Sequence, residues 1–109
     1  MNEVSKNDIA VQLLLTIQED SVTLDVSGAT SKSIVVKKPS GESNTYTASF
    51  YTDGSDGKIY YNTVSGDLDE VGLYKVQALV VLSGGTYRSD IKKFRVRDNI
   101  WVGKKTLFW

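Results

Sequence analysis

The sequence predicts an all-β protein, an immunoglobulin-like antiparallel β-sandwich of about seven strands. Apolar residues recur at every second position through most of the chain, which is the period of half-buried strands. Gly, Asp–Gly and Pro–Gly signals for turns separate these alternating runs. No segment has a convincing apolar period of 3.6 residues. Several short strands with turns between them are typical of a sandwich.

The N-terminal half supplies the first strands. Residues 9–17 (IAVQLLLTI) place Ile9, Leu13 and Ile17 on one face of a strand, and residues 22–26 repeat the alternation. Residues 32–52 read as a hairpin, because Pro39 presets the backbone for a turn and Gly41 can adopt a left-handed conformation. The second arm is rich in Thr and Tyr, which favour strands.

The C-terminal half contains the longest apolar stretch, residues 73–82 (LYKVQALVVL), after a short strand at 58–64. The SGGT segment then closes a tight hairpin, because paired glycines permit the favoured hairpin turns. In the returning arm Ile91 and Phe94 are three residues apart. We therefore expect a bulge near Lys92 and Lys93 that turns both apolar side chains toward the core.

The segment LDEVGLYKV predicts the corner before the sixth strand of an immunoglobulin-like sandwich. Leu68 is expected to plug the core, Gly72 to allow the tight corner, and Tyr74 to bond back to the upstream backbone. The neighbouring acids, Asp67, Asp69 and Glu70, could instead form a carboxylate site. A solvated loop or the cap of a short helical turn is the favoured interpretation of these acids.

Composition limits the classes of function. The chain has 109 residues, enough for one domain, with 13 Lys plus Arg and 13 Asp plus Glu. This balance of charge argues against a nucleic-acid binder and against a membrane-surface protein. The absence of Cys and His removes thiol chemistry, disulfides, ordinary zinc sites and imidazole catalysis.

The sequence predicts no enzyme: no catalytic residue, metal ligand or cofactor-binding residue is assigned, and no cofactor is expected. The spacing of Asp53, Ser55 and Asp56 does not match a calcium loop and suits turn formation. A Ser–Lys nucleophile stays open, without a motif to support it. Tyr51, Tyr60 and Tyr87 could form an aromatic platform for carbohydrate, although strand aromatics more often pack across strands.

The C-terminal segment is unusual, because it holds both tryptophans of the chain. We expect residues 1–98 to form the sandwich and residues 99–109 to form an apolar tail. Aromatic anchors are typical of interface hot spots, so the tail is predicted to dock on a partner or another copy, with packing on its own sandwich as the alternative. The predicted partner-binding residues are Ile100, Trp101, Val102, Leu107, Phe108 and Trp109.

Residues 27–99 resemble the small immunoglobulin-like domains of tailed-phage and prophage structural proteins. The layout is similar to that of the N-terminal domain of phage baseplate upper proteins. The shared elements, in order, are SGAT, KPSG, TDGSDGKIYY, GDLDEVGLYKVQ and SGGTYRSD.

The resemblance implies a non-enzymatic virion structural protein that binds other particle subunits, in the tail, the baseplate or a capsid decoration. It implies virion proteins as partners, a homo-oligomer or a larger assembly, and no nucleic acid or membrane. We expect location in the virion after synthesis in the host cytoplasm, because the N-terminus does not read as a signal peptide. The alternative is a module that binds host-surface glycans or proteins.

Overall fold

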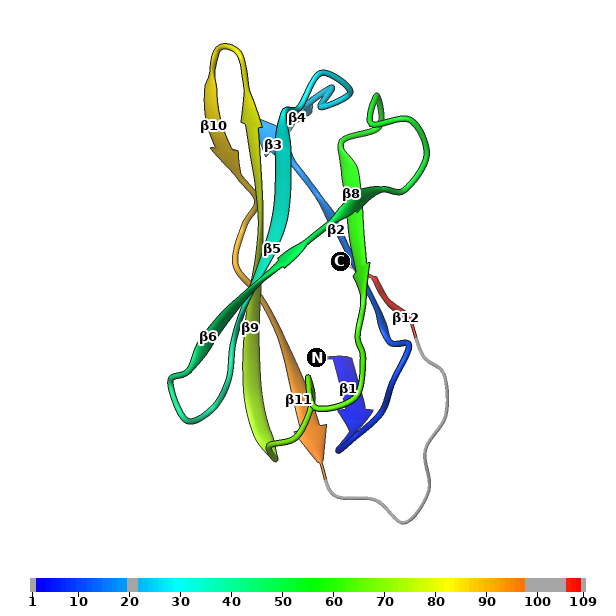
Figure 1. The fold of residues 1–109 in the computed structure, drawn as a ribbon, viewed down its shortest axis with the longest axis vertical. Coiled ribbons are helices and arrows are strands. Elements are labelled where there is room, and N and C mark those ends of the chain that lie inside the picture. Colours follow the sequence, from blue (N-terminus) through cyan, green and yellow to red (C-terminus); the bar gives the residue numbers. More distant parts are fainter. Residues whose placement is uncertain (1, 20–21, 98–105, 109) are drawn as a thin grey trace.

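The computed structural model describes residues 2–19, 22–97 and 106–108, and in these residues all regular structure is β-strand (Figure 1). Two sheets pack face to face, so the predicted immunoglobulin-like sandwich is confirmed. The described residues include no helix that is long and apolar enough to cross a membrane.

The larger sheet has the order β1-β11-β9-β5-β6, with β10 added beside β9. Its strands are β1 (Asn2–Ser5), β11 (Lys92–Arg97), β9 (Gly72–Leu82), β5 (Ser31–Lys37), β6 (Ser43–Thr47) and β10 (Gly85–Arg88). The β1–β11 pair is parallel and the other pairs are antiparallel.

The smaller sheet has the order β12-β2-β8-β7. Its strands are β12 (Thr106–Phe108), β2 (Gln12–Thr16), β8 (Lys58–Asn62) and β7 (Ser49–Phe50). A separate ribbon joins β3 (Gln18–Glu19) to β4 (Val22–Thr23). The described residues thus hold more short strands than the seven predicted. The predicted arm after Gly41 divides into β6 and β7 on different sheets, the last arm divides into β10 and β11 on the same sheet, and β1 and β12 are additional.

The core lies between the sheets and consists largely of the alternate residues that the period-two pattern indicates. In β2, however, three consecutive leucines, 13–15, are buried, and Ile9 lies before the strand and is 52% exposed. In β9, the side chains of Tyr74, Val76, Ala78 and Val80 are buried. The ring of Tyr74 stacks on that of Phe94 from β11, with 5.2 Å between centroids. Burial of such apolar area supplies most of the stability of a disulfide-free domain.

The bulge in the last arm lies just before β11 and not at Lys92 and Lys93, and it leaves Ile91 outside the core. Arg88 pairs with Leu79 and Lys92 with Val76, so three residues, 89–91, stand against two residues of β9. β11 pairs with β9 in unbroken register from Lys92 opposite Val76 to Val96 opposite Gly72. Ile91 and Phe94 therefore point to opposite faces, and Ile91 is 58% exposed. Lys92 takes the inward-facing position and stays partly exposed at the edge of the core.

The predicted tail lies mostly outside the described residues, which exclude Ile100, Trp101, Val102 and Trp109. The backbone of Leu107 and Phe108 belongs to β12, which runs parallel to β2 at the edge of the smaller sheet. Residues 106–108 thus return to the sandwich of their own chain (Figure 1).

Candidate functional site

The acidic segment predicted as a loop joins the two sheets. Asp67 accepts hydrogen bonds from the hydroxyls of Tyr46 on β6 (3.1 Å) and Tyr61 on β8 (2.7 Å). The backbone N–H of Val64 also donates to Asp67, at 2.8 Å. The two tyrosine rings stack with centroids 4.4 Å apart and planes 8° apart. One carboxylate thus ties a strand of each sheet to the β8–β9 loop.

Both tyrosines are held in the protonated form that this arrangement needs. Burial, assisted by the charge of Asp67 and the hydrogen bond to it, raises the pKa of Tyr46 to about 12. Burial and the hydrogen bond to Asp67 also raise the pKa of Tyr61. A phenolate would lose its hydrogen bond and face a carboxylate, so these hydroxyls serve as donors rather than as bases.

The other two acids of the loop bind the β5–β6 hairpin. Asp69 contacts the ammonium of Lys38 at 2.8 Å, and Glu42 reaches the same ammonium at 3.4 Å. The hydrogen bond to Lys38 lowers the pKa of Asp69, and the same bond raises the pKa of Lys38. Glu70 accepts from the N–H and the hydroxyl of Ser40, at 3.1 and 3.0 Å.

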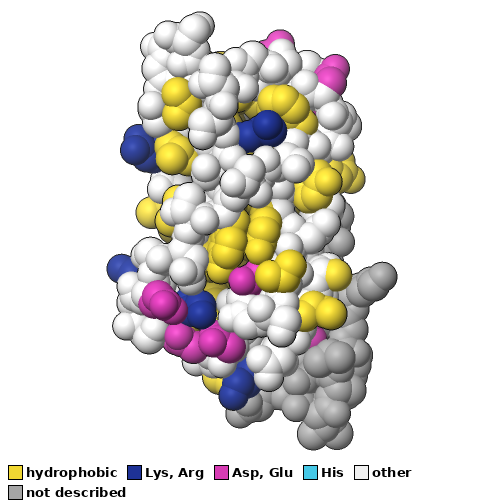
Figure 2. All heavy atoms as spheres, in the orientation of Figure 1, with side chains coloured by type: hydrophobic (Ala, Val, Ile, Leu, Met, Phe, Trp, Pro, Cys, Tyr) yellow, Lys and Arg dark blue, Asp and Glu magenta, His cyan; other side chains and the backbone are white. Residues whose placement is uncertain are grey.

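These contacts form a structural clasp. Figure 2 shows acidic and basic side chains gathered beside one another at the end of the β5–β6 hairpin. Each acid of the segment already has donors from the protein. The arrangement therefore gives no support to the carboxylate site considered from the sequence.

The three corner residues lie beneath the clasp. Leu68 and Tyr74 are buried, and the Tyr74 hydroxyl accepts a hydrogen bond from the backbone N–H of Glu70 at 3.1 Å. Burial raises the pKa of Tyr74. Gly72 has φ +140°, and a Cβ there would lie 2.8 Å from Cγ of Pro39. The corner thus packs directly on the hairpin turn.

The β7–β8 loop is a set of turns rather than a metal site. Asp53 accepts from the N–H and the hydroxyl of Ser55, at 2.9 and 2.6 Å. The side-chain bond from Ser55 lowers the pKa of Asp53. Asp56 accepts from the Thr52 hydroxyl and from the N–H of Lys58. Among the described residues, no group of three or more His, Cys, Asp or Glu side chains is placed to hold a metal.

The three tyrosines considered as a carbohydrate platform are not brought together. Tyr51 and Tyr60 meet edge to face on the smaller sheet, with centroids 6.3 Å apart and planes 84° apart. Tyr87 lies on β10 of the larger sheet and packs against the core. The tyrosines therefore do not share one exposed face.

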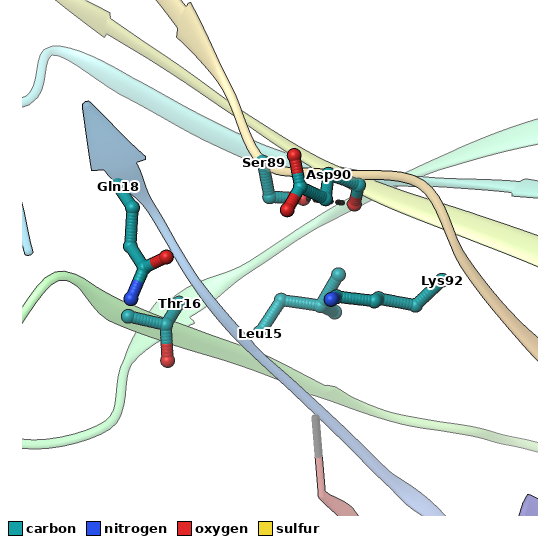
Figure 3. A pocket seen from close by; sticks show the side chains of 6 residues that line it. All are labelled: Leu15, Thr16, Gln18, Ser89, Asp90 and Lys92. Carbon is teal, nitrogen blue, oxygen red and sulfur yellow. Dashed lines mark hydrogen bonds between the residues drawn. The ribbon is translucent and has the colours of Figure 1, made fainter. Parts of the chain in front are cut away.

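A pocket of about 290 Å³ opens between the sheets beside β2 and β11 (Figure 3). Its lining residues are Leu15, Thr16, Gln18, Ser89, Asp90 and Lys92. Ser89 already accepts from the N–H of Ala78 and donates to the carbonyl of Asp90. The pocket is at the small end of the range for ligand sites and has no aromatic wall, so it offers little to hold a ligand.

The outer face of the larger sheet carries a row of lysines that the sequence analysis missed. Lys37 on β5 stands directly opposite Lys75 on β9, which stands directly opposite Lys93 on β11. All three side chains are exposed. Like charges directly opposite one another destabilise a sheet, so the charges of this lysine row do not stabilise the fold.

The positive charge continues along the same face. Arg95 and Arg97 alternate with the buried side chains of β11, and Arg88 on β10 stands opposite Leu79. Glu3 on β1 stands in register with Arg95. Within the described part of the chain, both salt bridges involve Lys38, which points away from the lysine row into the clasp.

Shallow apolar hollows flank the lysine row on both sides. One lies between Val35, Gln77 and the exposed Ile91, and the other between Pro39, Gly41 and Leu73. Lys37 and Lys75 border both hollows. We call the lysine row, the arginines and the two hollows the basic face. The signal for it lies in the sequence, at outward positions of three strands, but recognising it requires their register.

The fold and these sites define an immunoglobulin-like β-sandwich whose distinctive surface is a basic sheet face. No family model and no curated protein sequence matches the chain. Among solved structures, CopC from Methylosinus trichosporium OB3b is similar, with a TM-score of 0.56 and 17% identity. The match covers 92% of this chain and 88% of CopC. At this identity the likeness establishes the fold.

This comparison corrects the interpretation from the sequence. The structural likeness is to CopC and not to a phage structural domain. The resemblance to baseplate proteins and the function as a virion structural protein are therefore wrong. The virion location and virion partners depended on that resemblance and are not proposed. At 17% identity the likeness to CopC concerns the fold alone, and fold by itself does not specify function.

Proposed function

We propose that the chain is a non-enzymatic binding module that holds an acidic polypeptide segment on the basic face. The observation that carries this proposal is the register of Lys37, Lys75 and Lys93 on three adjacent strands. Each opposed pair of like charges destabilises the sheet. The negative charges of an anionic partner would attract these lysines and offset the repulsion between them.

The hollows favour a polypeptide over a nucleic acid. Both hollows are bordered by Lys37 and Lys75, and their apolar positions suit Leu-like or Val-like side chains of a polypeptide. Proteins that bind single-stranded nucleic acid usually stack its bases on aromatic side chains. The described outward residues of β5, β9 and β11 include no aromatic side chain.

The same features support binding rather than catalysis. The chain lacks His and Cys. Asp67 and Asp69 of the β8–β9 loop already accept hydrogen bonds from the side chains of Tyr46, Tyr61 and Lys38. In the pocket between the sheets, the Ser89 hydroxyl is already hydrogen-bonded to backbone groups. No constellation of nucleophile and base occurs in the described residues of these sites.

The test uses a short synthetic peptide that alternates Glu with Leu, labelled for fluorescence anisotropy. The full chain should bind it saturably, and added salt should weaken the binding. Lys75→Glu should weaken affinity about tenfold, because it removes the central cation of the row and adds a repulsive charge. Lys58→Glu is the matched control: it changes net charge equally but lies on the smaller sheet.

Three results would contradict the proposal. Equal losses in the two variants would mean attraction to net charge without a site. Equal binding of a Gln–Leu peptide would remove the need for acidic side chains. Equal or tighter binding of a single-stranded oligonucleotide, with the same loss in Lys75→Glu, would assign the face to polyanions instead of polypeptides.

A further inference from the structure

The edge of the larger sheet at β6 lacks the usual protection against pairing with another strand. β6 is the last strand of its sheet and pairs with β5 alone (Figure 1). Its five residues, SNTYT, include no charged residue and no proline. Proteins normally protect such edges with lysine, proline, bulges or very short strands. The other described end strands of the two main sheets have four residues or fewer.

The hydrogen-bond pattern shows which backbone groups β6 leaves unused. The N–H of Ala48 donates to the carbonyl of Lys32 at 3.0 Å, and the N–H of Lys38 donates to the carbonyl of Glu42 at 2.8 Å. In an antiparallel pair, every second residue bonds to the neighbouring strand. The N–H and C=O groups of Asn44 and Tyr46 therefore point toward β5. Ser43, Thr45 and Thr47 direct their N–H and C=O groups away from the sheet.

The side chains at this edge are self-complementary. Ser43, Thr45 and Thr47 are exposed and carry small hydroxyl groups. A two-fold axis at Thr45 places Thr45 opposite its own copy and Ser43 opposite Thr47. Thr–Thr and Thr–Ser pairs are favourable across antiparallel strands, and this pairing brings no like charges together.

We infer that two copies of the chain associate by antiparallel pairing of β6 with β6 around Thr45, which forms one continuous sheet. The outward N–H and C=O groups of Ser43, Thr45 and Thr47 then all find partners. Strand pairing alone buries less area than a standard interface, so the dimer is weak and depends on concentration. The two-fold axis stands perpendicular to the sheet, and it puts both basic faces on the same side. The inference itself does not depend on the proposed function.

Sedimentation velocity of the full chain over a concentration series tests this dimer. The unmodified chain should shift from monomer to dimer as concentration rises. Thr45→Lys and Thr45→Glu should each stay monomeric, because each places like charges opposite one another at the axis. An equimolar mixture of the two variants should form dimers again. Thr86→Lys is the matched control, with the same exchange at an exposed position of β10.

A second measurement uses the unmodified chain and so avoids any effect of substitution on folding. Amide hydrogen exchange at Ser43, Thr45 and Thr47 should slow as concentration rises, while exchange at Asn44 and Tyr46 should not change. The inference is overturned if these three amides exchange at a rate independent of concentration. It is also overturned if Thr45→Lys dimerises like the unmodified chain, or if the mixed variants stay monomeric.

Discussion

At the scale of single residues, Asp67 shows how one carboxylate can organise a sandwich. It accepts from two tyrosines that belong to different sheets and from the backbone of its own loop. The two rings stack on each other, so the hydroxyls are held close to the carboxylate by packing as well as by hydrogen bonds. The clasp therefore depends on the protonation of the tyrosines.

We predict that stability falls as pH rises from 10 to about 12. The pKa of Tyr46 is about 12 in the folded chain and near 10 in the unfolded chain, so the folded state binds more protons in this interval. The contribution is fully present below pH 10 and is lost as pH rises through the folded pKa. Urea unfolding across this range measures the slope, which should be shallower in Tyr46→Phe. An identical slope in the variant would contradict the role of the hydroxyl.

Lys75 is expected to lower the stability of the sheet that contains it. It stands opposite Lys37 and Lys93, and Lys75→Gln removes both repulsions. We expect the free energy of unfolding to rise by about 0.5 kcal/mol at low salt, and the gain to shrink as salt increases. Urea unfolding checks this, with Lys58→Gln as the control. A loss of stability in Lys75→Gln would mean that the lysine stem packs on the sheet favourably.

At the scale of elements, the corner before β9 depends on contact with the β5–β6 hairpin. Gly72 begins β9 with a backbone conformation that side chains rarely adopt, and Pro39 fills the space where a Cβ would stand. The Tyr74 hydroxyl holds the chain just before this point through Glu70. Strand, turn and corner therefore stabilise one another.

We predict that Gly72→Ala destabilises the chain by about 1–3 kcal/mol, from backbone strain and from the clash with Pro39. The free energy of unfolding in urea provides the measurement. Gly28→Ala is the control, because no heavy atom lies within 4 Å of its added Cβ. It should leave stability nearly unchanged. Equal effects of the two substitutions would remove the special role of the corner.

At the scale of the whole molecule, each main sheet has a short parallel strand at one edge, and the two strands come from opposite ends of the chain. β1 pairs with β11 in the larger sheet, and β12 pairs with β2 in the smaller one. β12 covers the backbone edge of Gln12, Leu13 and Leu14. Its removal would leave those strand groups open at an edge while the core strands stay paired.

We predict that a chain ending at Asp98 keeps its all-β circular dichroism but loses about 1–3 kcal/mol of unfolding free energy, because the described part of the removed segment is the edge strand β12. Dimerisation through β6 should persist, since β6 belongs to the other sheet. Loss of cooperative unfolding would show that β12 is needed for the fold. Loss of the dimer alone would show that the C-terminal segment, as the sequence suggested, drives self-association.

The sequence by itself determined the fold class, the hairpin at Pro39–Gly41 and the corner position of Tyr74. These features are local: alternation, turn residues and a buried tyrosine are readable from neighbouring positions. The resemblance to phage proteins was wrong because it rested on the same kind of local signal, short turn motifs. Turn motifs recur in sandwiches of unrelated function.

Only the tertiary structure decided which surface carries the candidate site. The lysine row needs the register of β5, β9 and β11, and the clasp needs β6 and β8 to meet at Asp67. A shift of one residue in register would send each lysine to the opposite face. Ile91 was misassigned for the same reason, since the extra residue between Arg88 and Lys92 lies just before β11 and leaves Ile91 exposed. Strand pairing is a long-range property, and no local pattern contains it.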